Sequence, residues 1–484
     1  MATDDLPHST PSAEGVDPAG LEAFLDAIED APQIDLHGLV ALRHGRVIAE
    51  GWWSPYSADR VHLLYSLSKS FTSTAAGLAV AEGLLDLDAT VLSYFPELDG
   101  EITDPRSRAM KVRHIAAMAS GHATETLDRA RRADPTNLVR GFLLTPPDQD
   151  PGTVFAYNQP CTYTLAAIVQ RRSGQSLIDY LRPRLFDPLG IEQALWIEEP
   201  PGQDIGFSGL HATTDAIARL GQLYLQRGRW RDRQLLDPAW VDEATSKQVD
   251  NPAEENPDWR QGYGFQFWMA RHGYRGDGAF GQFCIVLPEV DVVLALTAAT
   301  EDMQGILDAV WEHVLPAIDA AAPDHDADRR LADRLAAAAL PPLSAKAEPD
   351  DRQVWDGATF LPGPDAQTED SPLGQIGIRL TRAGLRHDDS GWLLSITDTG
   401  GTLEVPVGSD GWAVDDASGV PVAVSGGWSD PDTFVADVIF LETPHKVRLV
   451  CSGPERTLAP LWRTVALHPT SVVQLRGPRP TSAR

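Results

Sequence analysis

The stretch SLSKSFTSTAAGLAV, residues 66–80, contains the pair of residues on which the interpretation of this chain depends. Ser66 stands three residues before Lys69, and positions i and i+3 lie on the same face of a helix. A lysine beside a serine in a partly desolvated cleft loses pKa and accepts the hydroxyl proton, which activates the serine as a nucleophile. The chain has five lysines against thirty-five arginines, and only Lys69 has a serine three residues upstream. The stretch therefore predicts a helix that carries a nucleophile and its base.

Ser66 also fits a second interpretation, in which it is only the N-cap of that helix. Serine is favoured at an N-cap, and residues 61–65 have the pattern of a strand or loop that ends there. The two interpretations are compatible, because a nucleophile at a helix N-terminus gains from the positive end of the helix dipole and from free backbone amides. Ser68 and Ser70 are poorer candidates, since adjacent residues do not share a helix face with Lys69.

A second proton-transfer group is expected in the segment PGTVFAYN, residues 151–158. Tyr157 follows a Pro-Gly turn and precedes a helical pattern, at a loop end where a phenol can point into a cleft. A phenol between a nucleophile and a leaving group is able to accept and return a proton. The alternative is a packed aromatic residue, which this segment taken alone favours.

Composition and charge exclude several classes of function. The 484 residues carry a formal charge of −29, which argues against nucleic acid and anionic membranes as partners, because both need clustered cations. The first residues, MATDDLP, have no pattern of an export signal, so a cytoplasmic location is expected. Three widely spaced cysteines predict neither a disulfide framework nor a zinc site, and the thirteen histidines show no metal-binding spacing. No cofactor or metal is therefore expected.

The order of periodic segments predicts an α+β domain in which helices flank an antiparallel sheet. Residues 21–28 have helical spacing, and residues 39–43 and 47–52 form a hairpin around a glycine-containing turn. A mostly helical region is inserted from about residue 86 to about residue 250. Strands are expected again at 262–268, 282–287 and 291–297, followed by a closing helix at 306–318. Cys284, in the second of these strands, is expected to be a buried thiol.

The remainder of the chain has a different pattern. The first domain is expected to end near residue 320, and residues 321–351 contain a short Ala/Arg-rich helix and a Pro-rich linker. Residues 352–467 have short alternating runs separated by Gly and Asp, which predict a small all-β domain. Residues 468–484 have the composition of a disordered tail.

Five segments resemble a known family in their order and spacing. They look like the serine beta-lactamase and penicillin-recognising enzyme superfamily, closest to the class C-like branch of esterases, D-amino-acid peptidases and 6-aminohexanoate-dimer hydrolases. The resemblance covers roughly residues 15–320. The segments are YSLSKSFTSTAAGLAVAEGLLDLDATV (65–91), RHIAAMASG (113–121), PGTVFAYN (151–158), GLHATTDAIARLGQLYL (209–225) and GDGAFGQF (276–283).

By this resemblance Ser66 is the nucleophile that forms an acyl-enzyme, Lys69 its activating partner and Tyr157 the proton shuttle of a Tyr-x-Asn motif. The chain departs from the motif at Gln159, where the family usually has Asn or Ser, and Asn158 is a weaker substitute for the contact to a substrate amide.

The third motif of the family, typically Lys/His-Thr/Ser-Gly on a strand, aligns loosely with residues 275–278, with a register uncertain by one or two residues. The resemblance implies that a backbone amide near Gly278 or Ala279 completes the oxyanion hole with that of Ser66. Arg275 or His272 then replaces the basic residue of the motif. The triplet Arg275-Gly276-Asp277 as such carries no weight, because three-residue matches arise freely by chance.

The sequence thus predicts a hydrolase of small esters or amides, with esters favoured because their leaving group needs less protonation than an amine. Amidases of the 6-aminohexanoate-oligomer or D-amino-acid type are the alternative. A true beta-lactamase is less expected without an export signal, and a catalytically silent binding protein is disfavoured by the intact Ser66 and Lys69. No Gly-x-Ser-x-Gly motif of an α/β-hydrolase occurs. The C-terminal β domain either caps the cleft or makes a contact in a homo-oligomer.

Overall fold

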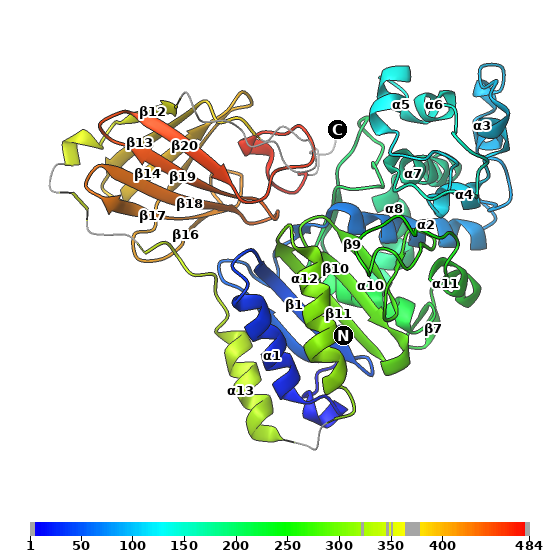
Figure 1. Cartoon of the computed structure of the whole chain (residues 1–484), viewed down its shortest axis with the longest axis horizontal. Helices are drawn as coiled ribbons and strands as arrows, with labels where there is room; N and C mark the ends of the chain where they lie inside the picture. Colours follow the sequence, from blue (N-terminus) through cyan, green and yellow to red (C-terminus); the bar gives the residue numbers. More distant parts are fainter. Residues whose placement is uncertain (1–4, 321–323, 345–347, 350–351, 364–377, 480–484) are drawn as a thin grey trace.

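An antiparallel sheet of six strands, in the order β2-β1-β11-β10-β9-β8, forms the centre of the first domain (Figure 1). The computed structural model describes residues 5–320, 324–344, 348–349, 352–363 and 378–479. The strands of this sheet are β1 (Asp35–Arg43), β2 (Arg46–Trp52), β8 (Trp268–Met269), β9 (Tyr274–Gly278), β10 (Gln282–Leu287) and β11 (Val292–Ala299). The α+β class and the flanked antiparallel sheet predicted from the sequence are confirmed.

The central strands are buried on both faces because their apolar side chains alternate between two hydrophobic cores. In β10, Phe283 and Ile285 belong to one core, whereas Cys284 and Val286 belong to the other. A strand with two covered faces reads as a continuous apolar run, which is the pattern of QFCIVL at 282–287. The expectation that Cys284 is a buried strand thiol is confirmed.

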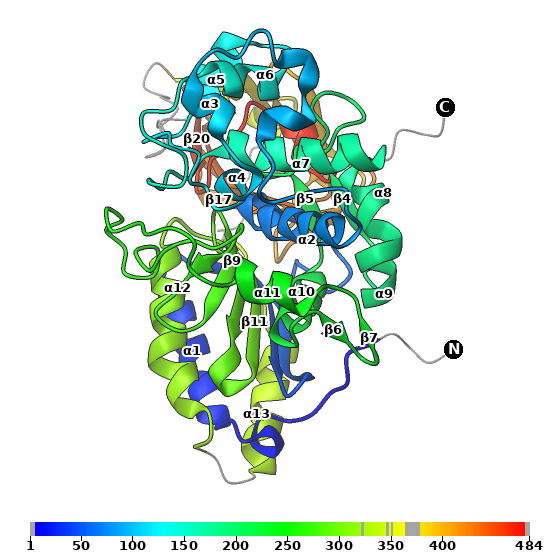
Figure 2. The ribbon, with the colours of Figure 1, turned by 90° about the vertical axis from the view of Figure 1, so that its right-hand side faces the viewer.

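Helices cover both faces of this sheet (Figures 1 and 2). On one face lie α1 (Pro18–Glu29), α12 (Met303–Ala309) and α13 (His325–Ala336), which pack on one another and on the sheet. On the other face α10 (Thr214–Leu225) contacts β1, β10 and β11. The closing helix expected at 306–318 is α12, continued by a π-helical turn at Val310–Val314 and a 3-10 turn at Leu315–Ala317.

A mostly helical region is inserted between β2 and β8, as the sequence predicts. Helix α2 (Ser68–Ala81) runs through it, packs against α7 (Gln159–Ser173) and is buried on nearly all sides. The other helices are α3 (Pro105–Ala109), α4 (Val112–Ala116), α5 (Leu127–Ala133), α6 (Leu138–Leu144), α8 (Leu177–Leu181), α9 (Asp187–Leu189) and α11 (Pro238–Ala244). Short strands are β3 (His62–Leu63), β4 (Ala194–Trp196), β5 (Leu210–Ala212), β6 (Arg229–Trp230) and β7 (Arg233–Gln234).

The strand predicted at residues 262–268 is wrong for most of its length, since β8 covers only Trp268–Met269. Tyr263, Phe265 and Phe267 do alternate with smaller residues, but all three enter the same core. Gln266 has a positive φ of 65°, which interrupts an extended strand, and its side chain donates to the carbonyl of Ala116. Aromatic alternation here comes from a looped segment packed on the core.

The C-terminal domain is a nine-stranded, nearly closed sheet around its own hydrophobic core. All its neighbouring strands are antiparallel except β12 and β20, which pair in parallel. Its strands are β12 (Thr359–Pro362), β13 (Arg382–Asp388), β14 (Gly391–Thr397), β15 (Thr402–Pro406), β16 (Ala413–Asp415), β17 (Val422–Asp430), β18 (Thr433–Phe440), β19 (Lys446–Ser452) and β20 (Thr457–Trp462).

Residues 468–479, which the sequence analysis assigns to a tail, pack against both domains. Val472 and Leu475 are buried in the core of the β domain, and the backbone amide of Gly477 donates to the carboxylate of Glu442 at 2.6 Å. The apolar residues spaced through this polar segment explain its order. Residues 480–484 of the expected tail lie outside the described residues. In the part of the chain that the structure describes, no helix is long and apolar enough to cross a bilayer.

Candidate active site

Ser66 lies in a 3-10 turn, Tyr65–Leu67, that leads directly into α2. The N-cap position of α2 is occupied by Leu67, and no side-chain hydrogen bond caps the helix there. The sequence left open whether Ser66 serves as an N-cap, and the structure gives its side chain a different partner. The Nζ atom of Lys69 lies 3.0 Å from the Oγ atom of Ser66.

Lys69 is a buried amine with no carboxylate among its hydrogen-bond partners. Its side chain is 1% exposed, and besides Ser66 it donates to the backbone carbonyl of Phe207 at 2.7 Å. Burial lowers the pKa of Lys69 to about 7, while the charges of Glu125 and Asp277 act in the opposite direction. At neutral pH a large fraction of this amine is therefore uncharged and able to take a proton.

Tyr157 lies beside Lys69, at the entrance to α7. The Nζ atom of Lys69 is 4.7 Å from the centroid of the Tyr157 ring, which stacks on Trp268 at 5.2 Å. Burial raises the pKa of Tyr157, chiefly through desolvation of the phenolate, whereas a hydrogen bond with Ser66 acts in the opposite direction. The phenol is thus protonated at neutral pH.

Asn158 and Gln159 follow Tyr157 and differ in how their side chains are used. The Asn158 side chain is fully buried, and its Oδ1 atom accepts hydrogen bonds from the backbone amide and the hydroxyl of Thr126 at 3.1 and 2.8 Å. Its side chain therefore holds the loop before α5. The Oε1 atom of Gln159 is buried without a hydrogen-bond partner, as is the Nδ2 atom of Asn158.

Strand β9 approaches the Ser66 turn so closely that only glycine fits at two of its positions. A Cβ atom at Gly278 would lie 2.0 Å from the carbonyl oxygen of Leu64, and one at Gly276 would lie 2.4 Å from the Oγ atom of Ser70. The end of β9 thus lies against the segment that carries Ser66. Ala279 follows directly, and its carbonyl accepts a hydrogen bond from the Gln282 side chain at 3.2 Å.

Arg275 and Asp277 form an ion pair on the opposite face of β9, with 3.0 Å between Nε and Oδ2. Arg275 is fully buried, and its guanidinium lies 4.4 Å from the ring of Trp259. Burial raises the pKa of Asp277, an effect that the Arg275 charge counteracts. Arg275 was predicted from the sequence and Asp277 was not, although the two are alternate residues of one strand and therefore share a face.

Two further placements complete the polar surroundings. Glu125, for which the sequence gives no clear signal, accepts hydrogen bonds from the backbone amides of Thr126, Leu127 and Gln159, and its pKa is raised by desolvation. His272, the alternative to Arg275, is exposed and packs on Trp311, so the structure does not bring it to Ser66. Among the described residues, no group of three His, Cys, Asp or Glu side chains is arranged to hold a metal ion.

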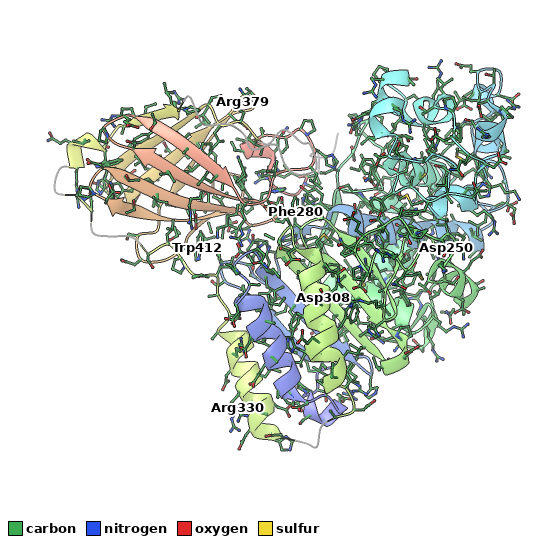
Figure 3. All side chains as sticks on the ribbon, in the orientation of Figure 1. Asp250, Phe280, Asp308, Arg330, Arg379 and Trp412 are labelled. Atoms are coloured by element: carbon green, nitrogen blue, oxygen red, sulfur yellow. The ribbon has the colours of Figure 1, made fainter. Side chains whose placement is uncertain are left out.

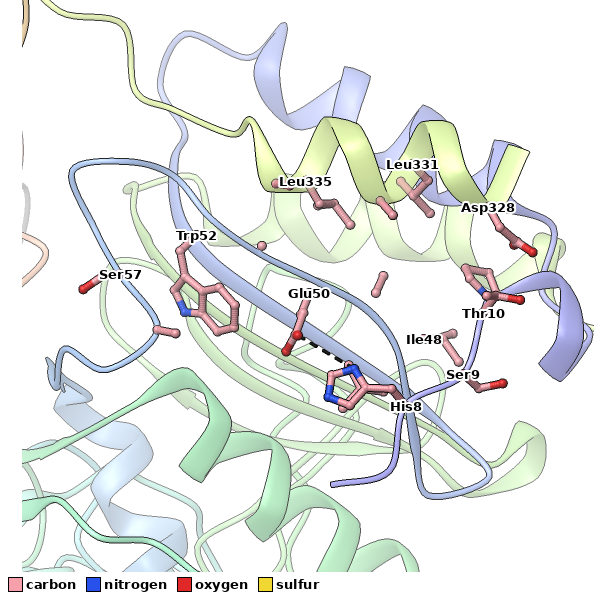
Figure 4. Close-up of a pocket in the computed structure, with 17 residues that line it drawn as sticks. His8, Ser9, Thr10, Ile48, Glu50, Trp52, Ser57, Asp328, Leu331 and Leu335 are labelled. Carbon is pink, nitrogen blue, oxygen red and sulfur yellow. Dashed lines mark ion pairs between the residues drawn. The ribbon is translucent and has the colours of Figure 1, made fainter. Parts of the chain in front are cut away.

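A separate cavity of about 560 Å³ lies between the N-terminal segment, β2 and α13 (Figure 4). His8 and Glu50 line it and lie 3.8 Å apart, between Nδ1 and Oε1, and Leu331 and Leu335 of α13 form its apolar side (Figure 4). None of the site residues predicted from the sequence lines it. The chemistry of this cavity is thus distinct from that of the Ser66 site.

Two relatives carry names that describe hydrolases. A lovastatin esterase from Penicillium rubens is 30% identical over 168 residues, which are 30% of this chain and 42% of the esterase, so less than half of that relative is matched. A 6-aminohexanoate-dimer hydrolase from Paenarthrobacter ureafaciens is 26% identical over 309 residues, 58% of this chain and 78% of that enzyme.

A solved structure extends the similarity to the second domain. The crystal structure of SurE aligns over 92% of this chain and 98% of its own length, with 18% identity and a TM-score of 0.50. At this identity the alignment shows a similar fold and nothing further. The family model described as Beta-lactamase matches residues 25–317, more than half of the chain. The beta-lactamase-like fold expected from the sequence motifs is therefore confirmed, and the chain belongs to the Beta-lactamase family.

Proposed function

We propose that this chain is a serine hydrolase that acts on small esters or amides through an acyl-enzyme on Ser66. The observation that carries the proposal is the contact of 3.0 Å between the Ser66 hydroxyl and a buried Lys69 amine whose pKa is lowered to about 7. A base with a pKa near the working pH is best suited to proton transfer. The names of the two hydrolase relatives agree with this chemistry.

In the first step Lys69 takes the Ser66 proton while the Oγ atom forms a bond to the substrate carbonyl carbon. The carbonyl oxygen becomes an oxyanion, which backbone amides of Ser66 and Ala279 stabilise, since β9 ends against the Ser66 turn. No metal or cofactor is needed for this charge balance. The family motifs imply an amide near Gly278 or Ala279, and we take that of Ala279, which directly follows the glycine that lies against Leu64.

Collapse of the tetrahedral intermediate breaks the bond to the leaving group, which takes a proton from the Tyr157 phenol. The Lys69 ammonium then returns a proton to Tyr157, and the acyl group remains on Ser66. In deacylation a water molecule attacks the acyl carbon and gives one proton to the Lys69 amine. Collapse of the intermediate releases the carboxylic acid, and the Oγ atom of Ser66 takes this proton back from Lys69. The raised pKa of Tyr157 keeps the phenol protonated at neutral pH, so that it has a proton to give to an alkoxide or amide leaving group, which is a stronger base.

Amide hydrolysis is the second candidate, and Gln159 favours it. The buried Oε1 atom of Gln159 has no hydrogen-bond partner, and it follows Tyr157 by two residues. An amide N–H would satisfy this acceptor, whereas the alkoxy oxygen of an ester would not. The matched 6-aminohexanoate-dimer hydrolase is named for an amide substrate.

The proposal is tested with a fluorophosphonate probe and a substrate panel. We expect the probe to form an adduct on Ser66, detected by mass spectrometry of the digested protein. We expect Ser66→Ala to lose p-nitrophenyl ester turnover, with Ser70→Ala as the matched control, because the Ser70 hydroxyl donates instead to the carbonyl of Gln266. A folded protein without an adduct would favour a binding function. Linear amides, D-amino-acid amides and a chromogenic cephalosporin separate the substrate classes.

A further inference from the structure

Two residues with side chains and positive φ flank the proposed oxyanion hole. Tyr65, with φ of 47°, precedes Ser66, and Phe280, with φ of 68°, follows Ala279. Such backbone conformations are unfavourable for residues other than glycine, and they persist only where the surroundings impose them. The two rings contact each other edge to face, with centroids 5.4 Å apart. A contact that fixes these two rings therefore also fixes the backbone amides of Ser66 and Ala279.

The contact that holds both rings comes from the other domain. His445 lies in the turn 441–445 between β18 and β19, and its Nε2 atom is 2.7 Å from the Tyr65 hydroxyl. The centroid of the His445 ring is 5.7 Å from that of Phe280. Figure 3 places Phe280 at the end of the main sheet that faces the β domain. The β domain thus reaches the two residues next to the proposed oxyanion hole.

The direction of the hydrogen bonds follows from the second ring nitrogen. The Nδ1 atom of His445 is 3.1 Å from the carbonyl oxygen of Thr464, which can only accept, so Nδ1 carries the proton. The Nε2 atom then accepts from the Tyr65 hydroxyl, and the Tyr65 oxygen accepts in turn from the backbone amide of Leu467 at 3.4 Å. Burial lowers the pKa of His445 to about 4, which keeps the imidazole neutral.

The same turn also fixes the backbone two residues before Tyr65. The backbone amide of Leu63 donates to the carbonyl of Glu442 at 2.8 Å, and Leu63 packs with Tyr65 and Phe280 in one small hydrophobic cluster. Residues 63 and 65 are therefore both held from the β domain, immediately before the nucleophile.

We propose that His445 is a positioning residue of the oxyanion hole, so that the β domain completes the active site. This inference rests on the proposed function. His445 does not contact the reacting atoms; it holds Tyr65 and Phe280, and through them the backbone amides of Ser66 and Ala279. The proposal predicts an effect on the chemical step with little effect on substrate binding.

Tyr65→Phe is the direct test, because it removes only the hydroxyl that His445 accepts from. Its matched control is Tyr56→Phe, since the Tyr56 hydroxyl donates to the carbonyl of Thr443 in the same turn, at 3.4 Å. Loss of one oxyanion donor lowers kcat by about 100- to 1,000-fold in serine proteases, and partial misplacement should give roughly 10- to 100-fold. We expect this loss in Tyr65→Phe with KM changed less than about twofold, and kcat within about twofold of the parent in Tyr56→Phe.

Conservative replacement of His445 supplies a second, independent readout. A glutamine side chain can accept from Tyr65 and donate to Thr464, whereas leucine can do neither. We expect His445→Gln to retain at least about tenfold more kcat than His445→Leu. Thermal unfolding of each variant reports stability separately, and the rate constant of fluorophosphonate labelling gives the same comparison independently of substrate choice.

The outcomes separate this inference from the function on which it rests. Failure of the parent protein to label on Ser66 would overturn the proposed function and the positioning role together. Labelling of the parent with equal rate constants for Tyr65→Phe and Tyr56→Phe would overturn the positioning role alone. Equal kcat in His445→Gln and His445→Leu, in folded proteins, would have the same meaning.

Discussion

Two cations are buried in the walls of the candidate site, and the structure treats them differently. Lys69 on α2 is 1% exposed and bonds only to neutral oxygens, those of Ser66 and Phe207. Arg275 on β9 is 0% exposed and pairs with the carboxylate of Asp277 at 3.0 Å. Both side chains are basic and buried, but only Arg275 has a counter-ion in direct contact.

The difference shows how the burial of a basic side chain determines whether it can lose its proton near neutral pH. An amine without a paired carboxylate relieves its desolvation by losing a proton, which makes Lys69 a base with a pKa of about 7. A guanidinium does not lose its proton in proteins, so a buried arginine needs a counter-ion. Lys69 is therefore suited to proton transfer, whereas Arg275 with Asp277 is suited to holding β9 and its charges in place.

Lys69→Arg places an arginine at both buried positions and is expected to have the largest effect on kcat. Arginine keeps the positive charge but does not act as a base, so kcat should fall by about 1,000- to 10,000-fold. The measurement is the initial rate of p-nitrophenyl ester hydrolysis with a matched amount of folded protein. Lys69→Met is the control, expected to be equally inactive but more stable than the parent. Substantial activity of Lys69→Arg would remove Lys69 from the role of base.

Arg275→Met removes the buried ion pair and leaves Asp277 without its partner. Removing one member of a buried ion pair costs about 3–5 kcal/mol of stability, which urea unfolding followed by circular dichroism would measure. The double variant Arg275→Met/Asp277→Leu is expected to recover part of this loss, because no uncompensated charge remains. If the double variant is as unstable as the single one, the packing of Arg275 on Trp259 matters more than the ion pair.

The pH dependence of kcat/KM sharpens the comparison, because only the lysine wall titrates near neutrality. The uncharged amine is the active form, so the rate should rise with pH through a midpoint near 7, the pKa of Lys69. At about two pH units below this midpoint the rate should be lower by roughly 100-fold. A profile without an acid limb between pH 5 and 8 would contradict the assignment.

Glu125→Gln tests the smaller influence of charges around the unpaired lysine. The Glu125 charge raises the pKa of Lys69, so its removal should lower that pKa and move the acid limb to lower pH. Glutamine retains a carbonyl oxygen for the backbone amides of Thr126 and Leu127, whereas the backbone amide of Gln159 loses its acceptor. Glu125→Asp, which keeps the charge, is the control. A shift to higher pH would show that the charge acts in the opposite sense.

The α2 wall could be predicted from the sequence because its two residues are three positions apart in one helix. That spacing brings Ser66 and Lys69 together without knowledge of the rest of the fold. Tyr157 was located by its motif, and the buried strands around Cys284 were located by their continuous apolar run. In each of these segments the local pattern and the tertiary environment agree.

The remainder depends on contacts between segments far apart in the chain. The approach of Gly278 to Leu64 joins residues 214 positions apart, and no periodicity encodes it. The alternation of aromatic residues predicted a strand at 262–268, but the positive φ of Gln266 interrupts it. The tail prediction for residues 468–479 followed their polar composition, whereas Val472 and Leu475 anchor the segment in the β domain.

The hydrogen bond between Tyr65 and His445 joins residues 380 positions apart and so has a consequence for the timing of synthesis. At about 5–20 residues per second, a ribosome needs roughly 20–80 seconds to add that length of chain. The first domain matches its family up to residue 317, so about 130 residues, or roughly 6–26 seconds of this time, remain for it to fold before the turn 441–445 is made. Under the positioning role proposed for His445, a nascent chain acquires its full hydrolytic activity only when the β domain has been translated.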